Sequence, residues 1–263
     1  MSKSNPVVSI IIATKNEELN INRLLVSIRK QTYKNIEVII VDNFSIDQTI
    51  KIAQRFNTRI IQQSRERSKQ RNTGAVQAKG KYLLFLDADM ELPQNIIGMC
   101  VKKCEHGKYA ALIIPENTPL ISWFAHIKNL EKSIYKNEDL IEAPRFITKT
   151  SFTSVGGYNE NLIAGEDWDL AQKMRNHHVN IGRINSSLYH YETSLFRELK
   201  HKWYYTKSIH NYAQKYPRAF KKQSGLKRLE IFWRKRNLLF QHPLAATGLI
   251  LVKSIEFCMY ILK

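Results

Sequence analysis

The chain has 263 residues, 43% of them hydrophobic, which is enough for one α/β domain with a sizeable core or for such a domain with an appendage. Its 41 Lys and Arg residues against 23 Asp and Glu residues give a net charge of +18, which implies an anionic partner: nucleic acid, a membrane surface or a phosphorylated substrate. Three scattered cysteines exclude a disulfide framework, and the first residues lack the apolar stretch of a signal peptide, so we expect reduced thiols and a cytoplasmic location.

The first half of the chain alternates predicted strands with predicted helices. Four apolar, β-branched runs predict buried strands, at 7–13, 36–41, 59–62 and 82–86. Four stretches with helical patterns predict helices, at 20–30, 48–56, 68–78 and 93–105. This alternation predicts an α/β fold with a mostly parallel sheet, helices on both faces and right-handed connections.

The second half of the chain is less regular. Its patterns predict short strands at 110–114 and 146–148 and an extended segment at 181–190. They also predict helices at 123–135 and 167–176. Neither a dinucleotide-binding fingerprint nor a P-loop pattern is present, which counts against a dehydrogenase or a kinase. We expect one domain over 1–195 and a basic, helical extension over 196–263.

The extension combines a basic tract with an apolar end. Between Arg197 and Arg236 the acidic residues are only Glu198 and Glu230, among many Lys and Arg residues. The final segment, 243–262, is mostly apolar but contains Lys253 and Glu256, which are spaced to pair on one helix face. Three interpretations are open for this segment: an amphipathic helix lying in a membrane interface, a short transmembrane or re-entrant helix, and a helix packed on the folded core.

The strand at 82–86 ends in two carboxylates, Asp87 and Asp89. Because alternate side chains of an extended segment point the same way, the two can converge on one Mg²⁺ or Mn²⁺ ion, with a phosphate completing the coordination. The carboxyl ends of parallel strands are also where open α/β sheets bind ligands. A simple turn after a core strand would explain the same two residues without a function.

Further polar motifs occur at the predicted strand ends and on neighbouring helices. They are Thr14–Glu18 after the first strand, Asp42–Ser45 after the second, Arg71 on the helix before the Asp pair, Glu166–Asp169 at a helix start, and His190. Asp167 in a first helical turn is stabilised as an anion by the helix dipole and could act as a base, although plain helix capping is the alternative. Trp168 could stack on a sugar face or belong to the core.

The order and spacing of these motifs resemble those of the family 2 glycosyltransferases with the GT-A fold, over about residues 7–192. The resemblance implies an α/β domain that binds a nucleotide-sugar and a reaction that inverts the anomeric centre. It implies that the nucleotide-sugar is bound by Thr14, Asn16, Glu17, Asp42, Arg71, Asp87, Ala88 and Glu166, and we expect Trp168 to join this set through its ring.

The same resemblance assigns the metal and the base. Asp87-Ala88-Asp89 looks like the family's DxD motif, with Asp87 near the ribose and Asp89 on Mn²⁺ or Mg²⁺. Glu166-Asp167 looks like its ED motif, with Asp167 as catalytic base, and His190 matches a position that completes the metal site in some relatives. Many relatives read Asp-Asp-Gly-Ser where this chain reads Asp42-Asn43-Phe44-Ser45, which leaves the preferred base open, with UDP as the default.

The acceptor is the least determined part of the reaction. A positive surface beside an apolar helix favours an anionic membrane surface, and hence a glycan or polyprenyl-linked acceptor met at the cytoplasmic face of the membrane. If the acceptor is a polyprenyl phosphate, the nucleophile is already anionic and needs no strong base. A nucleotidyltransferase is disfavoured because the loop at 13–18 lacks glycine. A non-enzymatic nucleic-acid-binding module would use the 197–236 segment but has no need for the grouped carboxylates, so we expect no nucleic-acid partner.

Overall fold

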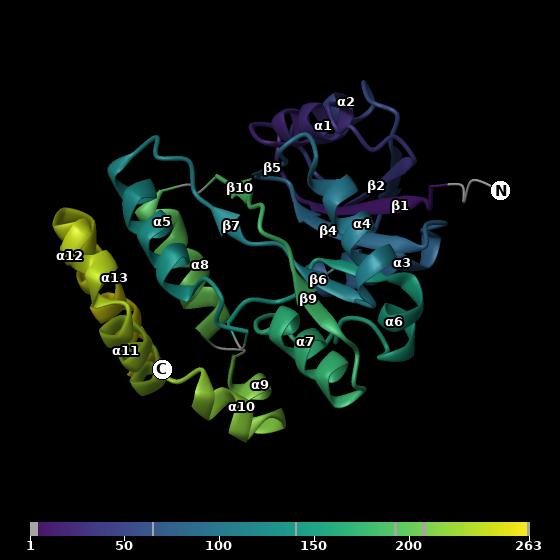
Figure 1. The fold of residues 1–263 in the computed structure, drawn as a ribbon. Helices are drawn as coiled ribbons and strands as arrows, with labels where there is room; N and C mark the ends of the chain where they lie inside the picture. The colour runs from purple at the N-terminus through teal and green to yellow at the C-terminus, as the bar shows by residue number, and fades with distance from the viewer. Residues whose placement is uncertain (1–4, 65, 140, 192–193, 207–208, 262–263) are drawn as a thin grey trace.

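The computed structural model describes residues 5–64, 66–139, 141–191, 194–206 and 209–261 (Figure 1). Its larger sheet has seven strands in the order β3-β2-β1-β4-β8-β6-β9. These strands are β1 (Val8–Thr14), β2 (Ile36–Asp42), β3 (Arg59–Gln62), β4 (Tyr82–Asp87), β6 (Ala111–Ile113), β8 (Phe146–Thr148) and β9 (Ile181–Arg183). Only β8 runs antiparallel to its neighbours, so the expected mostly parallel α/β sheet is confirmed.

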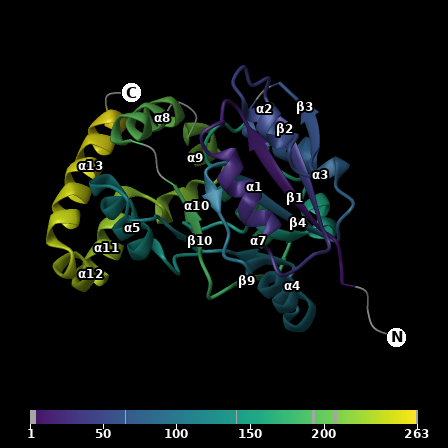
Figure 2. The ribbon, with the colours of Figure 1, turned by 90° about the horizontal axis from the view of Figure 1, so that it is seen from above.

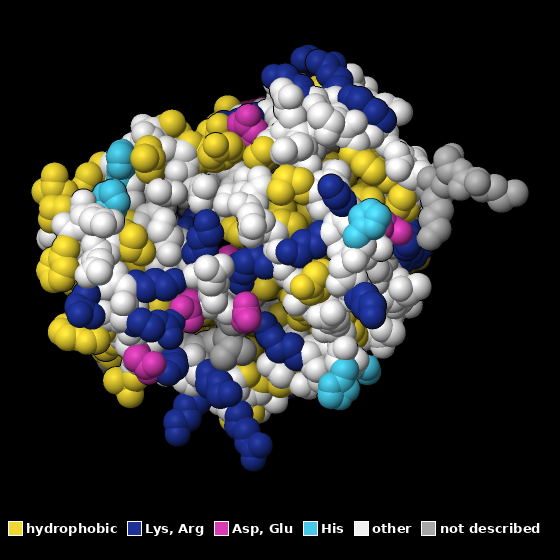
Figure 3. Space-filling model, in the orientation of Figure 1, with side chains coloured by type: hydrophobic (Ala, Val, Ile, Leu, Met, Phe, Trp, Pro, Cys, Tyr) yellow, Lys and Arg dark blue, Asp and Glu magenta, His cyan; other side chains and the backbone are white. Residues whose placement is uncertain are grey.

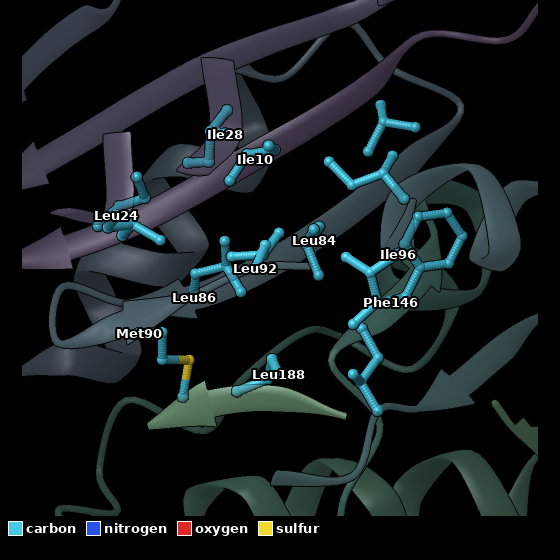
Figure 4. Close-up of a cluster of buried hydrophobic side chains, with 14 of the residues drawn as sticks. Ile10, Leu24, Ile28, Leu84, Leu86, Met90, Leu92, Ile96, Phe146 and Leu188 are labelled. Atoms are coloured by element: carbon cyan, nitrogen blue, oxygen red, sulfur yellow. The ribbon is translucent and has the colours of Figure 1, made fainter. Parts of the chain in front are cut away.

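A second, three-stranded sheet was not predicted. It has the order β5-β10-β7 and consists of β5 (Met90–Glu91), β7 (Glu116–Asn117) and β10 (Leu188–His190). The antiparallel pairing of β10 with β5 sets His190 opposite Met90, the residue after Asp89. Met90 and Leu188 point into the same buried cluster (Figure 4), which anchors this small sheet to the large one.

Helices cover both faces of the large sheet (Figures 1 and 2). Those of the first 191 residues are α1 (Ile21–Arg29), α2 (Thr49–Ala53), α3 (Arg67–Gln77), α4 (Ile96–Gly107), α5 (Trp123–Tyr135), α6 (Lys149–Ser154) and α7 (Glu166–Asn176). The strand residues alternate between two cores: Ile10 and Leu84 pack in the cluster with α1 and α4, whereas Ile11 and Phe85 pack in the cluster with α6 and α7. Burial on both faces explains why the strands read as continuous apolar runs.

The remainder of the described chain is helical. Its helices are α8 (Leu195–Thr206), α9 (Ile209–Lys215), α10 (Pro217–Lys222), α11 (Gly225–Arg234), α12 (Arg236–Gln241) and α13 (Pro243–Ile261). A third core joins α5 to α11 and α13 through residues such as Ile127, Ile231 and Leu249. One face of the final segment is therefore packed on the folded chain, as the third interpretation expects. Among the described residues, no helix has the length and hydropathy needed to cross a membrane.

One glycine sets how closely α3 approaches the sheet. A Cβ atom on Gly74 would lie 2.5 Å from Cγ2 of Ile11, well inside van der Waals contact. Glycine therefore lets α3 lie directly against β1. This close approach brings the preceding turn of α3, which contains Gln70 and Arg71, to the carboxyl edge of β1, β2 and β4.

Candidate active site

The loops after β1 and β2 are joined by one buried carboxylate. The strand register pairs Thr14 with Asp42, and Thr14 Oγ1 donates a hydrogen bond of 2.9 Å to Asp42 Oδ1. The backbone N–H of Ser45 donates to Asp42 Oδ2 at 2.7 Å, and Ser45 Oγ donates to Oδ1 at 2.5 Å. Gln70 reaches from α3 and donates to the carbonyl oxygens of Thr14 and Val41 at 3.0 and 2.6 Å. Hydrogen bonds from the loop after β2 and from α3 thus fix the carboxyl ends of β1 and β2.

Two residues of these loops adopt the left-handed backbone conformation. Asn16 has φ 54° and Phe44 has φ 49°. Asparagine tolerates this conformation, whereas a residue such as phenylalanine adopts it at a cost of about 1–2 kcal/mol. Phe44 stands where the Asp-Asp-Gly-Ser pattern has glycine. The loop therefore keeps a conformation that suits glycine although this chain has none there.

Glu17 lies close to the Asp pair. Its backbone N–H donates to Thr49 Oγ1 at 2.7 Å, and its side chain accepts a hydrogen bond of 2.9 Å from Asn20. Burial raises the pKa of Glu17, and the carboxylates of Asp89 and Asp87 raise it further. The strand register, which pairs Ala13 with Asp87, likewise places the start of the first loop beside the Asp87-Ala88-Asp89 motif.

Arg71 is a fully buried cation that connects two acidic motifs. Its Nη2 lies 2.8 Å from Asp87 Oδ1, while its Nη1 lies 3.0 Å from Asp167 Oδ1 and 3.6 Å from Glu166 Oε1. Burial by itself lowers the pKa of Arg71, but the surrounding carboxylates outweigh burial and hold that pKa well above its usual value. The ring of Tyr158 lies 5.2 Å from the guanidinium carbon. Arg71 is therefore charged and fixed in place.

Arg145 supplies a second cation on the other side of Asp87. Its Nη1 lies 3.2 Å from Asp87 Oδ2, and its Nε and Nη2 donate to Glu116 Oε1 at 3.0 and 2.7 Å. Burial would raise the pKa of Asp87, but Arg71 and Arg145 outweigh burial and hold that pKa well below its ordinary value. Asp87 is thus an anion clamped between two guanidinium groups.

His190 lies between Glu116 and Asp89. Its Nδ1 is 2.8 Å from Glu116 Oε2, and its Nε2 is 3.2 Å from Asp89 Oδ1. Burial lowers the pKa of His190, but Glu116 and Asp89 outweigh burial and raise that pKa to about 10. Glu116 and Asp89 therefore hold the imidazole at its two ring nitrogens.

The residues around Asp89 fit a metal ion shared between protein and nucleotide. Among the described residues, no group of three or more His, Cys, Asp or Glu side chains is arranged to hold an ion alone. Asp89 Oδ1, however, is buried and lies 3.2 Å from Nε2 of His190, so that a carboxylate oxygen and an imidazole nitrogen face one another. A carboxylate and an imidazole suit Mn²⁺, and a diphosphate would supply further oxygen ligands.

Asp167 and Glu166 begin α7 after Gly165, which has φ 76°. The side chain of Asp167 is 34% exposed, whereas that of Glu166 is 5% exposed and contacts Arg67 at 2.9 Å. Burial, followed by repulsion from Asp167, raises the pKa of Glu166. Asp167 is therefore the member of this pair that remains open to a reacting group, at the positive end of a helix dipole.

Ala88 and Trp168 complete the expected set. Ala88 is buried between the two Asp residues. Trp168 donates from Nε1 to the carbonyl oxygen of Ile141 at 2.9 Å, and its ring lies 5.8 Å from that of Tyr212 on α9. These contacts direct Trp168 toward the C-terminal helices. Apart from Trp168, the expected residues, Ala88 included, lie around the carboxyl edge of β1, β2 and β4, the start of α7 and the end of β10.

Sequence reasoning missed Gln70, Glu116 and Arg145. Gln70 is adjacent to Arg71 on α3 and one helical turn before Gly74. Glu116 lies two residues after the short strand predicted at 110–114, and Arg145 directly precedes the one predicted at 146–148. A charged side chain next to a buried strand is the signal that could have identified both.

Family models match two overlapping parts of the chain. The model of glycosyl transferase family 2 matches residues 9–156, and one described as the N-terminal domain of galactosyltransferase matches residues 145–202. Glycosyltransferase AglE of Haloferax volcanii is 29% identical over 184 residues, which are 64% of this chain and 60% of that protein. GalNAc(5)-diNAcBac-PP-undecaprenol beta-1,3-glucosyltransferase of Campylobacter jejuni is 30% identical over 110 residues, which are 39% of this chain and 36% of that protein. The chain thus spans less than two thirds of either relative.

Two solved structures resemble this chain over most of its length. TarS of S. aureus in complex with UDP-GlcNAc has a TM-score of 0.63 at 16% identity, and the match covers 97% of this chain and 89% of the TarS chain. Mannosyltransferase PcManGT of Pyrobaculum calidifontis in complex with GDP-Man and Mn²⁺ has a TM-score of 0.65 at 16% identity, covering 98% of this chain and 88% of that one. At such low identity these likenesses concern the fold. Together with the family model that spans more than half of the sequence, they show that this chain has the GT-A fold and belongs to glycosyl transferase family 2.

Proposed function

We propose that this chain is an inverting glycosyltransferase that moves a sugar from a UDP-sugar to a hydroxyl group of a glycan or lipid-linked acceptor. The main supporting observation is Arg71, which lies 2.8 Å from Asp87 and 3.0 Å from Asp167. One buried guanidinium thereby holds a carboxylate of the Asp87-Ala88-Asp89 motif beside a partly exposed carboxylate at a helix start. A nucleotide-binding motif and a candidate base share one site.

The donor would lie along the carboxyl edge of the sheet. TarS was solved with UDP-GlcNAc and PcManGT with GDP-Man, which supports a nucleotide-sugar as the donor here as well. We assign base and ribose recognition to the loops that contain Thr14, Asn16, Glu17 and Asp42, and ribose contact to Asp87. Because Asp42 already accepts hydrogen bonds from Thr14 and Ser45, its part is to keep these loops in place.

Asp89 and His190 would hold Mn²⁺ or Mg²⁺ together with the donor diphosphate. The ion would offset the negative charge that grows on the leaving diphosphate. On the protein side, Glu116 accepts the Nδ1 hydrogen of His190 and thereby turns Nε2 toward Asp89. Such a carboxylate–histidine pair fixes the orientation of a metal ligand.

Asp167 would act as the general base. An acceptor hydroxyl is a weak nucleophile and needs a proton acceptor within hydrogen-bond reach. As the acceptor oxygen bonds to the anomeric carbon, its proton passes to Asp167, and the electron pair of the breaking bond goes to the diphosphate. Arg71 orients Asp167 throughout, because one carboxylate oxygen stays on the guanidinium while the side chain remains partly open.

The substitution Asp167→Asn distinguishes the two kinds of acceptor. With a hydroxyl acceptor we expect turnover to fall about 10²–10⁴-fold, because the proton acceptor is lost. With a polyprenyl phosphate acceptor the nucleophile is already charged, and turnover would stay near normal. Glu160→Gln, which alters an exposed carboxylate nearby, is the matched control. The readout is single-turnover transfer, with circular dichroism to verify folding.

The donor can be identified without the acceptor. We expect slow hydrolysis of one nucleotide-sugar from a panel in the presence of Mn²⁺, and loss of that hydrolysis on chelation. Thermal stabilisation by UDP, but only with Mn²⁺, is expected as well. A chain that hydrolyses no donor and is not stabilised by UDP or GDP would contradict the proposal.

We also propose that the protein works peripherally at the cytoplasmic face of a membrane, where lipid-linked acceptors are found. The undecaprenol-linked substrate in the name of the Campylobacter jejuni relative favours this kind of acceptor. The basic, helical C-terminal part of the chain is the second supporting feature.

A further inference from the structure

The last helix, α13, turns its charged residues toward the protein. Ala246, Leu249 and Val252 pack in the third core against α5. The described exposed residues of α13 are all uncharged: Pro243, Leu244, Thr247, Ile250, Leu251, Ser254, Ile255, Phe257 and Cys258. A helix at a protein–water interface normally has the opposite arrangement, with charges outward. The outer face of α13 is therefore apolar for a reason other than packing within this chain.

A buried group of ion pairs holds α13 in this orientation. Lys253 contacts Glu131 of α5 and lies 2.8 Å from Glu256, its neighbour on α13. Lys128 of α5 lies 3.0 Å from Glu131 and 3.0 Å from Glu198 of α8. These pairs join three helices, and reversing α13 would leave buried charges without partners. The apolar face is thus fixed outward.

The helices before α13 extend this apolar surface. Leu226, Trp233 and Phe240 of α11 and α12 are 82%, 73% and 77% exposed, and Leu244 at the start of α13 is 81% exposed. Figure 3 shows hydrophobic side chains along the left edge of the molecule, where Figure 1 places α11, α12 and α13. We name this set the C-terminal apolar surface: Leu226, Leu229, Trp233, Phe240, Leu244, Leu251 and Ile255.

Basic residues predominate on the helices that lead into and form the C-terminal apolar surface. From 217 to 243 the chain contains one acidic residue, Glu230, which pairs with Lys227. Lys222 and Arg236 are exposed, and the guanidinium of Arg236 lies 5.3 Å from the ring of Trp233. An apolar face with a basic rim matches the boundary between the acyl chains and headgroups of an anionic bilayer.

We propose that the C-terminal apolar surface docks on an anionic phospholipid bilayer, with its apolar side chains in the headgroup–acyl boundary and Lys222 and Arg236 on lipid phosphates. This inference rests on the proposed function and deepens it, because it names the surface that would bring the enzyme to a lipid-linked acceptor. Helix α11, which contributes Leu226, Leu229 and Trp233 to this surface, also contacts the start of α7, because the guanidinium carbon of Arg228 lies 5.9 Å from the ring of Trp168, the neighbour of Asp167. Docking would therefore bring the candidate base close to the membrane plane.

Cosedimentation of the full chain with vesicles tests this docking. We expect binding to vesicles of phosphatidylglycerol and phosphatidylcholine, little binding to pure phosphatidylcholine, and weaker binding as salt is raised. Trp233→Ser/Phe240→Ser and, separately, Lys222→Gln/Arg236→Gln should each weaken binding on the order of tenfold. Val76→Ser, exposed on α3, and Lys51→Gln/Lys102→Gln, exposed on α2 and α4, are matched controls expected to bind normally.

Donor hydrolysis in the same samples separates this inference from the proposed function. Hydrolysis should be unchanged in all variants, because none alters the site around Arg71. Absent binding to anionic vesicles, or equal binding by surface variants and controls, would overturn the docking while hydrolysis still supports a transferase. Sedimentation velocity that shows a dimer lost in Trp233→Ser/Phe240→Ser, without vesicle binding, would assign the surface to a second copy of the chain and likewise overturn it.

Discussion

At the residue scale, the site is organised by alternating charges. Arg71 and Arg145 clamp Asp87, and Arg145 also holds Glu116, which in turn holds His190 beside Asp89. Each buried charge thus has an opposite partner, which is the condition for keeping charges out of water. Two of these carboxylates stay partly exposed beside their cationic partners: the side chain of Asp89 is 25% exposed beside His190, and that of Asp167 is 34% exposed beside Arg71.

Replacing Arg71 tests how much of the stability depends on this arrangement. Arg71→Met leaves Asp87, Glu166 and Asp167 without their shared cation, so we expect the free energy of unfolding to fall by about 3–5 kcal/mol. Arg67→Met, on the same helix, removes a partly exposed partner of Glu166 and should cost about 1 kcal/mol or less. Urea denaturation near neutral pH measures both, and equal costs would contradict the central position of Arg71.

The same variant has a predicted pH dependence. Because the folded pKa of Asp87 is held below its unfolded value, its contribution to stability is complete above about pH 4 and is lost as the pH falls toward the folded pKa. Wild-type stability should therefore decrease below about pH 4. Arg71→Met raises the folded pKa of Asp87, so the stability of this variant should depend less on pH in that range than the stability of the wild type.

Glu116 provides a test of how His190 is positioned. Glu116→Gln keeps the size of the side chain but removes the charge that faces Nδ1 of His190. We expect Mn²⁺ affinity in the presence of UDP to fall about 10–100-fold, as for other residues that orient a metal ligand. Electron paramagnetic resonance of free Mn²⁺ measures this independently of turnover. Unchanged affinity would mean that Glu116 serves only the fold around Arg145.

At the scale of elements, the apolar runs predicted the main sheet and the edge at which the candidate site lies. Apolar runs end at Thr14, Asp42 and Asp87, and the register places these three residues at one edge. The small sheet of β5, β7 and β10 could not be predicted, because strands of two or three residues have no periodic pattern to detect. Glu116 was missed for the same reason. Arg145 directly precedes β8, and the strands that pair with β8, β4 and β6, are distant from each other in sequence.

Gly74 sets how closely α3 packs against β1. Gly74→Ala adds a Cβ atom 2.5 Å from Ile11 Cγ2, so we expect a loss of about 1–3 kcal/mol despite the better helix propensity of alanine. Gly98→Ala on α4, where the nearest atom is 3.9 Å away, should instead stabilise by about 0.5–1 kcal/mol. In a double-mutant cycle, Ile11→Ala should remove much of the cost of Gly74→Ala. Additive effects would show that α3 moves without strain.

At the scale of the whole molecule, the third core and the buried ion pairs connect the C-terminal helices to α5. The spacing of Lys253 and Glu256 correctly suggested that they pair on α13. Sequence alone could not say whether that pair faces a bilayer, solvent or protein, because the deciding partner, Glu131, lies on α5 and far away in sequence. An apolar helix with two charges has the same sequence pattern in each of these settings. Only the position of α5 distinguishes them.

Lys253 therefore tests whether the C-terminal helices and α5 are stabilised together. Lys253→Met leaves the mostly buried carboxylates of Glu131 and Glu256 with one cation fewer, so we expect a loss of about 3–5 kcal/mol. Lys253→Met/Glu256→Leu removes one charge of each sign and should recover part of that loss. Lys227→Met, which breaks an exposed pair on α11, should change stability by less than about 1 kcal/mol. Amide hydrogen exchange locates the effect: faster exchange in both α13 and α5, with β1 and β4 unchanged, means that the buried pairs lock the two helices together, whereas faster exchange in α13 alone would show that α5 is held by the sheet domain without them.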